Sequence, residues 1–191
     1  MAQQGIASGN PVAVILFDVQ GFFDNIQKDR TVYLFDILGF PDSMTQWLHS
    51  FLSNRSVSLH FNGWTSDTIS ATNGTPQGSP LSPIISAVYS LPLLQRAQTW
   101  HTGSLQMFVD DGAVAASCAT HRSAIGKAGR LFEDVTDWFM RSGLRTDPDK
   151  TEFIMFYNPR RLIDLIGSPP PNIALCNATN GEIIVPHLSC V

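Results

Sequence analysis

An unbroken apolar run near the N-terminus constrains the fold more than any other feature of the sequence. Residues 12–17 are six apolar residues in a row, bounded by Pro11 and Asp18. Such a run is typical of a β-strand buried on both faces, because a strand with one face in water alternates apolar and polar residues. The chain therefore needs a sheet with neighbours for this strand, and the strand ends in a carboxylate.

The remaining pattern predicts helices and short strands in a mixed order. We expect helices over residues 28–38, 43–52, 84–97 and 120–142, and strands over residues 55–61, 64–71, 105–109, 113–117 and 152–157. Thr120 is a suitable N-cap and Gly143 a stop for the last helix, while Pro92 kinks or shortens the third. Tight hairpin turns are expected at Asn62-Gly63 and at Asp111-Gly112. This order predicts an α+β fold, a small antiparallel sheet with helices packed on one face.

The chain has a strongly patterned main part and a weakly patterned C-terminal part. Its 191 residues fit one domain, by the usual domain sizes. We assign residues 1–158 to this domain and residues 159–191 to an incomplete C-terminal segment. That segment contains a Ser-Pro-Pro-Pro stretch with polyproline character, and only residues 182–185 resemble a strand.

Composition excludes several classes of protein. Apolar residues make up 43% of the chain, so it packs a core and is not disordered. Three cysteines without paired spacing support neither a disulfide framework nor a zinc site, which fits an intracellular setting. No apolar run approaches the roughly 20 residues of a membrane span, and the first residues lack the basic start of a secretion signal.

The chain is acidic overall, and basic residues are few in its first half. The chain has 12 basic and 16 acidic residues, a net charge of −4. Its first 91 residues hold three basic residues, Lys28, Arg30 and Arg55, against six acidic ones. Proteins that bind phosphate backbones usually show a basic surface, so a chain with this charge would bind nucleic acid weakly and in a salt-sensitive way.

Acidic residues at two positions are candidates for a metal site. Asp18 follows the apolar strand, although a lone Asp there more often bonds its own loop. Asp110 and Asp111 lie at an expected hairpin tip, where paired acids are usually only solvated. Strand alternation turns Asp110 away from Val109, so one carboxylate can point at a neighbouring strand's Asp. Like charges this close need a cation, and phosphoryl transfer uses two divalent ions about 3.5–4 Å apart.

A third candidate is the loop of residues 74–83, which reads Gly-Thr-Pro-Gln-Gly-Ser-Pro-Leu-Ser-Pro. Glycines allow positive φ and close approach of the backbone, and prolines stiffen the loop before the next helix. Gln77 supplies a donor and an acceptor suited to a nucleobase or sugar. A purely structural Gly/Pro loop is the alternative, but ten specified positions are more than a chance pattern.

These segments together resemble the reverse transcriptases. The 74–83 loop resembles motif B, and its Ser-Pro-Leu-Ser-Pro ending resembles the non-LTR, LINE-type branch. Residues 18–24 resemble motif A, residues 108–111 motif C and residues 143–152 motif D, in the family's order. The likeness covers residues 10–157 and implies a reverse-transcriptase palm, with fingers and thumb largely absent from the chain.

The resemblance implies an RNA-directed DNA polymerase that adds deoxynucleotides to a primer 3′-hydroxyl. Asp18 and Asp110 would bridge two Mg²⁺ ions, with Mn²⁺ as a possible substitute, while Asp111 lies beside them and the Val19 carbonyl is a further ligand. Lys150 matches the motif D lysine that protonates the leaving pyrophosphate, a task that suits a cation near phosphate. A solvated lysine is the alternative role.

The resemblance also implies a nucleotide and template site. Phe23 matches the steric gate that excludes a 2′-hydroxyl, with core packing as the alternative role. The template base and incoming nucleotide would lie against the motif B loop, at Gly74, Pro76, Gln77 and Gly78. RNA template, DNA primer and dNTP are the implied partners; no membrane partner is expected, and the family implies a nuclear location.

The chain departs from the family pattern in two ways. Phe22 replaces a commonly small residue, and Phe108 and Val109 replace the commoner Tyr and Ala of motif C with other apolar residues. The basic fingers segment expected before motif A, and the primer grip and thumb expected after motif D, are not seen. A longer parent polypeptide would supply them.

Three hypotheses follow for the function. The first is an active reverse-transcriptase palm. The second is a truncated, inactive relic or interaction domain that keeps the palm fold. The small number of basic residues favours this hypothesis for the isolated chain. The third, a different metal-dependent nuclease or an RNA-templated RNA polymerase, is less well supported, because the loop lacks the Ser-Gly and Thr pattern expected of the latter.

Overall fold

The computed structural model describes residues 9–156, 175–176, 183–184 and 187–189. The chain forms two compact units, a sheet unit of Met1–Gln20 and Pro92–Val191 and an inserted unit of Gly21–Leu91. The predicted domain boundary at residue 158, the end of the predicted strand at Tyr157 and the polyproline stretch lie outside the described residues.

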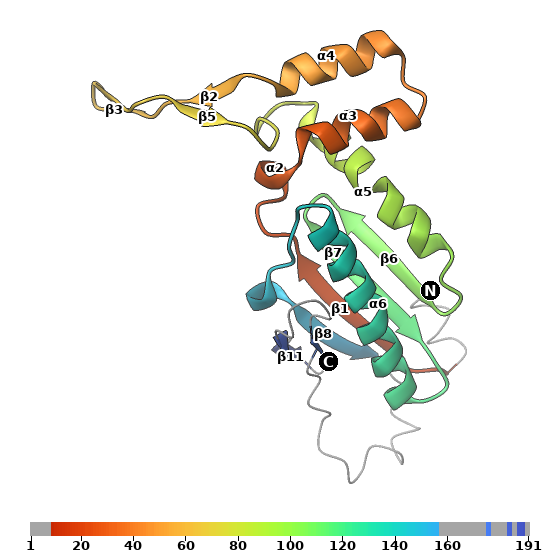
Figure 1. The fold of residues 1–191 in the computed structure, drawn as a ribbon. Coiled ribbons are helices and arrows are strands. Elements are labelled where there is room, and N and C mark those ends of the chain that lie inside the picture. The colour runs from red at the N-terminus through yellow and green to blue at the C-terminus, as the bar shows by residue number, and fades with distance from the viewer. Residues whose placement is uncertain (1–8, 157–174, 177–182, 185–186, 190–191) are drawn as a thin grey trace. The chain divides into compact units, whose positions relative to one another are not determined.

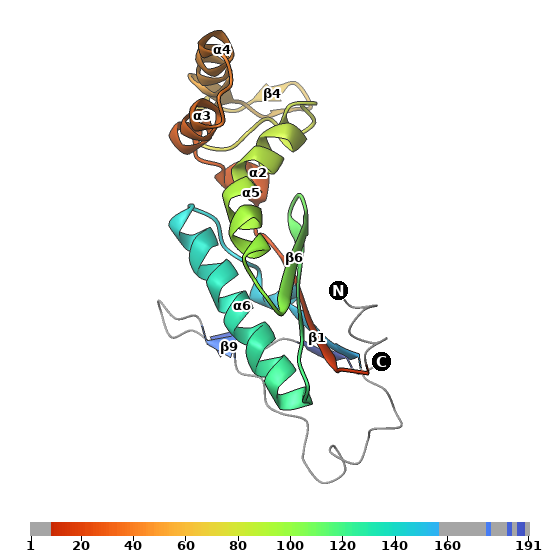
Figure 2. The ribbon, with the colours of Figure 1, turned by 90° about the vertical axis from the view of Figure 1, so that its right-hand side faces the viewer.

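The sheet unit is built on a five-stranded sheet in the order β11-β8-β1-β7-β6. Its strands are β1 (Val12–Asp18), β6 (Gly103–Phe108), β7 (Asp111–Ser117), β8 (Glu152–Phe156) and β11 (His187–Ser189). Strand β1 pairs antiparallel with β7 and β8, β6 pairs antiparallel with β7, and β11 joins β8 in parallel. Helix α6 (His121–Arg141) packs along one face (Figures 1 and 2). The predicted α+β class, with an antiparallel sheet and a helix on one face, is confirmed.

Three short elements also belong to this unit. The 3₁₀ helix η1 (Pro148–Lys150) precedes β8, and strands β9 (Leu175–Cys176) and β10 (Ile183–Ile184) pair with each other. The strand expected over residues 182–185 is present as β10, within the part of that range that the structure describes.

The central strand β1 is buried unequally on its two faces. Ala13, Ile15 and Phe17 are buried, whereas the residues between them are half-buried. The ring centroid of Phe17 lies 5.5 Å from that of Phe132 and 6.0 Å from that of Phe139, both on α6. The prediction of burial on both faces is therefore wrong for one face, because among the described elements a helix covers only the other.

Helix α6 follows its predicted pattern. Ala128, Phe132, Val135 and Phe139 are each 0% exposed, as expected for an apolar stripe with 3- and 4-residue steps. The Thr120 side chain accepts a hydrogen bond from the Ser123 N–H, and the Ser123 side chain accepts one from the Thr120 N–H. This reciprocal capping box explains why the helix begins after Thr120.

We expect Thr120→Ala to lower the free energy of unfolding by about 1 kcal/mol, since it leaves a helix N–H without its cap. Thr120→Ser keeps a hydroxyl acceptor and should retain most of the stability. Chemical denaturation followed by circular dichroism measures both. Equal loss in the two variants would mean that the hydroxyl does not cap the helix.

The inserted unit contains helices and two short ribbons. Its elements are α2 (Phe22–Asn25), α3 (Lys28–Ile37), α4 (Asp42–Leu52), β2 (Arg55–Val57), β3 (His60–Phe61), β4 (Trp64–Thr65) and β5 (Ile69–Ala71). Strand β2 pairs with β5 and β3 with β4, so the segment forms one long hairpin (Figure 1). Asn62 and Gly63 have φ of 47° and 76°, which confirms the predicted turn and gives it type I′ character.

Helix α5 (Ser82–Gln98) begins in the inserted unit and continues through Pro92, where the sheet unit resumes. Pro92 therefore does not shorten the helix. Within the described part of the chain, no helix is both long and apolar enough to cross a membrane.

The predicted Asp111-Gly112 turn is wrong. The β6–β7 hairpin turns at Val109 and Asp110, while Asp111 already pairs with Phe108 inside the ladder. Gly112 instead lies opposite Phe17 on β1, and a Cβ atom there would stand 2.1 Å from the Phe17 Cζ. Glycine is needed at this position to make room for an aromatic ring.

Candidate active site

The β1–β7 pairing brings two acidic segments together at the end of the sheet. Asp18 is the register partner of Asp111, and the Val19 N–H donates to the Asp110 carbonyl oxygen at 2.8 Å. Because Phe17 faces α6 and side chains alternate along a strand, Asp18 and Asp111 lie on the opposite face. Directly paired residues have Cβ atoms about 4.5–5.5 Å apart, so their carboxylates share one small region.

Asp110 is held in a tight turn with unusual backbone geometry. The residue before it, Val109, has φ of 58°, a left-handed conformation that a β-branched residue rarely adopts. Such conformations cost about 1–3 kcal/mol and persist where the surroundings fix them. Here the β6–β7 ladder and the Val19 bond fix the turn, so Asp110 stays close to the end of β1.

Lys150 lies directly against this acidic group. Its Nζ is 3.1 Å from Asp18 Oδ2, and the Asp18 side chain is 17% exposed against 61% for Lys150. The hydrogen bond to Asp18 raises the pKa of Lys150, with the charges of Asp18, Asp147 and Asp110 adding to the rise and burial opposing it. The ammonium is therefore protonated at neutral pH and acts as the cation beside Asp18.

The segment that carries Lys150 is attached to the end of β1 by backbone hydrogen bonds. The Asp147 N–H donates to the Asp18 carbonyl at 2.8 Å, and the Gln20 N–H donates to the Arg145 carbonyl at 2.8 Å. The Asp147 side chain accepts the Asp149 N–H at 3.1 Å and caps η1. Sequence reasoning missed Asp147; its signal is the Asp-Pro-Asp sequence, which is typical of a capped turn.

The residues fit a divalent metal by their chemistry, although they do not form a complete ligand set. Carboxylate oxygens are the ligands that Mg²⁺ and Mn²⁺ prefer, and the Lys150 ammonium shows that the acidic group attracts a cation. Among the described residues, no three His, Cys, Asp or Glu side chains stand close enough to hold an ion. Asp18, Asp110, Asp111 and the Val19 carbonyl would be the ligands, without further geometry.

The second group of predicted site residues lies in the inserted unit. The Gly74 N–H donates to the Ile26 carbonyl and the Thr75 N–H to the Phe23 carbonyl, both at 2.7 Å. These bonds attach the 74–83 loop to α2. A Cβ at Gly74 would stand 2.7 Å from the carbonyl oxygens of Phe23 and Asp24, so this close approach requires glycine.

Side chains reinforce the attachment of the loop. Gln77 Nε2 donates to Asp24 Oδ1 at 3.2 Å, and Ser82 Oγ donates to the Pro76 carbonyl at 2.7 Å. Arg55 Nη2 donates to the Gly74 carbonyl at 2.5 Å. The loop is thus a built structure rather than a free turn. Asp24 and Arg55 were not predicted as site residues, although Asp24 is the last residue of the segment that resembles motif A.

Phe23 is half-buried, and its ring meets the Phe22 ring at 6.0 Å in an edge-on arrangement. Phe22 is buried and packs edge-on against Tyr89 at 6.4 Å. The large residue at Phe22 therefore has a packing role, and Phe23 remains partly exposed. Gly78 has φ of +85° with open space around it. The predicted residues thus fall into two groups, one in each unit.

Comparison with known proteins assigns the chain to a family of polymerases. The family model described as reverse transcriptase (RNA-dependent DNA polymerase) matches residues 5–179. Since the match covers most of the sequence, the chain belongs to the reverse transcriptase family. No curated protein matches it.

Solved structures of telomerase share the fold. Telomerase from Candida tropicalis in complex with the TWJ fragment of telomeric RNA is 13% identical, with a TM-score of 0.59 over 92% of this chain and 30% of that one. Apo telomerase from the same organism, truncated from its C-terminal domain, is 13% identical, with a TM-score of 0.61 over 95% of this chain and 37% of that one. The chain therefore spans about a third of the length of these telomerase chains. At this identity the likeness shows the fold alone.

Proposed function

We propose that the chain is the palm region of a non-LTR retrotransposon reverse transcriptase, which extends a DNA primer on an RNA template. The β1–β7 register carries this proposal, since it pairs Asp18 with Asp111 beside the Asp110 turn. The family match supports the polymerase class. The Ser79-Pro80-Leu81-Ser82-Pro83 sequence at the start of α5 supports the non-LTR branch.

Each group of residues has a distinct role in this proposal. Divalent ions held by Asp18, Asp110 and Asp111 would stabilise charge on the attacking and leaving oxygens. Lys150 holds a proton beside the acidic group and would donate it to pyrophosphate once its bond to Asp18 opens. The 74–83 loop, fixed to α2, would support the nucleotide through Gln77. In this proposal the chain binds an RNA template, a DNA primer and a dNTP.

Primer extension on an RNA template with Mg²⁺ tests the proposal on the full chain. Wild-type protein should incorporate deoxynucleotides and Asp110→Asn should not, because an amide replaces a charged metal ligand. Asp67→Asn removes one negative charge from an exposed loop residue of the inserted unit and serves as the matched control. Failure of wild type and all variants would support the second candidate, an inactive palm. The three basic residues in the first 91 favour that candidate for the isolated chain.

Phe23→Ala should raise the incorporation of ribonucleotides relative to deoxynucleotides, because removal of the ring would leave space for a 2′-hydroxyl. The change is expected to be at least about tenfold, or about 1.4 kcal/mol in discrimination. Single-nucleotide extension with each nucleotide type measures it. Phe23→Tyr keeps an aromatic ring and should keep the selectivity. Unchanged selectivity in Phe23→Ala would assign the ring to packing.

A further inference from the structure

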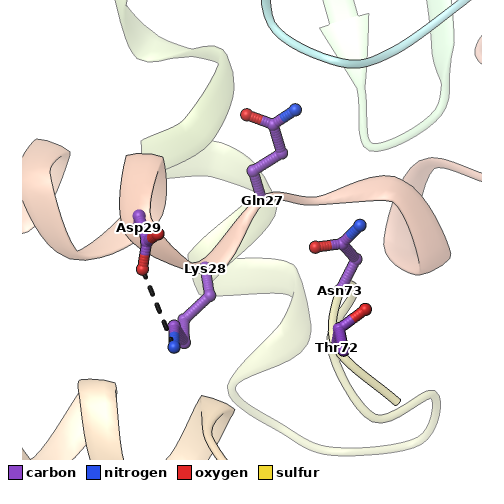
Figure 3. Close-up of a pocket in the computed structure, with 5 residues that line it drawn as sticks. All are labelled: Gln27, Lys28, Asp29, Thr72 and Asn73. Carbon is purple, nitrogen blue, oxygen red and sulfur yellow. Dashed lines mark ion pairs between the residues drawn. The ribbon is translucent and has the colours of Figure 1, made fainter. Parts of the chain in front are cut away.

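Two cavities of the inserted unit adjoin at Lys28 and Thr72. The first has a volume of about 330 Å³ and is lined by Gln27, Lys28, Asp29, Thr72 and Asn73 (Figure 3). The second has a volume of about 180 Å³ and is lined by Lys28, Leu52, Ser53, Asn54, Arg55, Ser70, Ala71 and Thr72. We name the pair the Lys28–Arg55 site. Its walls come from the start of α3, the end of α4 and the base of the β2–β5 ribbon.

The charge of the second cavity is the observation that identifies its ligand. Lys28 and Arg55 are two of the three basic residues in the first 91 residues of an acidic chain, and both line this one cavity. No acidic residue of the described chain lines it. Its remaining polar side chains carry hydroxyl or amide groups, which can donate to an anion. The cavity therefore favours a small negatively charged group.

Among the described residues, Arg55 forms no ion pair with a carboxylate, and Lys28 forms one with Asp29. Arg55 is held by backbone carbonyls, through Nε to Leu52 at 3.3 Å and through Nη2 to Asn73 at 2.7 Å and Gly74 at 2.5 Å. These bonds position the guanidinium and leave its charge without a paired acid among the described residues. Lys28 meets Asp29 at 3.7 Å, beyond hydrogen-bond distance, and the Asp29 side chain is 91% exposed. A solvated pair of this kind is weak.

The backbone adds to the positive potential. Lys28 is the first residue of α3, and the N-cap Gln27 makes no side-chain capping bond. The first N–H groups of a helix carry a partial positive charge and favour anions, especially phosphate. Gln27 and Asn73, which also line the first cavity, both carry side-chain amides (Figure 3). Amides of this kind suit the polar edge of a base or a sugar hydroxyl.

We propose that the Lys28–Arg55 site binds a phosphate group, supplied by the backbone of a single-stranded nucleic acid. The phosphate occupies the smaller cavity between Lys28 and Arg55, and the adjacent nucleoside lies in the larger one. Backbone carbonyls use three of the five N–H donors of Arg55, at Nε and Nη2, so its Nη1 group is left to donate to a phosphate oxygen. This site does not depend on the carboxylates of the sheet unit, so it stands or fails apart from the proposed polymerase activity.

Binding to the full chain without divalent metal tests the site. The probes are a labelled ten-nucleotide single-stranded RNA, a peptide nucleic acid of the same sequence that lacks phosphates, and inorganic pyrophosphate. Lys28→Gln should weaken RNA binding about fivefold at 0.1 M salt and reduce the slope of log affinity against log salt by about 0.7, the effect of one phosphate contact. Binding of the peptide nucleic acid should not change. Lys127→Gln on α6, which carries the same charge change outside both cavities, should leave RNA binding and slope unchanged.

A second variant guards against a fold defect. Thr72→Val removes a lining hydroxyl from an exposed residue without changing charge, so RNA affinity should fall while the salt slope stays constant. Thermal melts confirm that both variants are folded. If Lys28→Gln weakens pyrophosphate binding and not RNA binding, the site holds a free phosphate ligand instead of a backbone. If Lys28→Gln matches Lys127→Gln for every probe, the site is not a phosphate site.

Discussion

Gly112→Ala is expected to lower the free energy of unfolding by about 3 kcal/mol, the upper end for overpacking in a filled core. The added methyl group would stand 2.1 Å from Phe17 Cζ. The Phe17 ring cannot turn aside easily, because it packs against Phe132 and Phe139, both 0% exposed. A loss of this size is a large share of the roughly 5–15 kcal/mol that stabilises a typical domain. Urea denaturation followed by circular dichroism measures it.

Gly126→Ala is the control for this prediction. Gly126 lies on an exposed part of α6, with no atom within 4 Å of the position that a Cβ would take. Alanine is a better helix former than glycine, so this variant should gain about 0.5–1 kcal/mol. The same substitution is thus expected to lower the free energy of unfolding at Gly112 and to raise it at Gly126. An unchanged free energy of unfolding in Gly112→Ala would mean that the Phe17 ring does not lie against Gly112.

Gly74→Ala is expected to destabilise the protein by about 3 kcal/mol and to detach the 74–83 loop. Part of the loss comes from φ of +81°, which costs an alanine about 1–2 kcal/mol. The rest comes from contact with the carbonyl oxygens of Phe23 and Asp24 at 2.7 Å, since backbone atoms cannot rotate away. Denaturation gives the stability, and amide hydrogen exchange at Thr75 reports its bond to Phe23.

Gly39→Ala separates the two causes. Gly39 has φ of +80°, and no atom lies within 4 Å of the position that a Cβ would take. This variant should therefore show the conformational cost alone, about 1–2 kcal/mol. The difference between the two variants measures the close approach of the loop to α2. Equal losses would show that the approach leaves room for a methyl group.

Local patterns predicted most of the elements. The strand at residues 12–17, the apolar stripe of α6 and the Asn62-Gly63 turn each depend on short-range physics, and the structure confirms all three. The prediction of a turn at Asp111-Gly112 was wrong because it considered only the local turn preference of the Asp-Gly pair. In the fold, Gly112 is needed to leave space for the Phe17 ring. That requirement involves a residue 95 positions away, so a local rule could not reveal it.

The site was partly predictable for the same reason. Strand ends and acid pairs marked Asp18, Asp110 and Asp111 from the sequence, and the register then joined Asp18 to Asp111. The ion pair of Lys150 with Asp18 was not predictable, because it depends on how residues 145–147 bond to the end of β1. Arg55 was likewise missed: its role depends on backbone carbonyls nearly twenty residues away, which carry no side-chain signal.

Titration of the full chain with Mn²⁺, followed by electron paramagnetic resonance, tests the central claim that Asp18 and the Asp110 turn form a metal site. The wild-type chain should bind Mn²⁺ saturably, and Asp67→Asn should bind it equally well. Asp18→Asn and Asp110→Asn should each lose affinity by at least about tenfold, since each removes a charged oxygen ligand. Equal Mn²⁺ binding by all four proteins would contradict the claim.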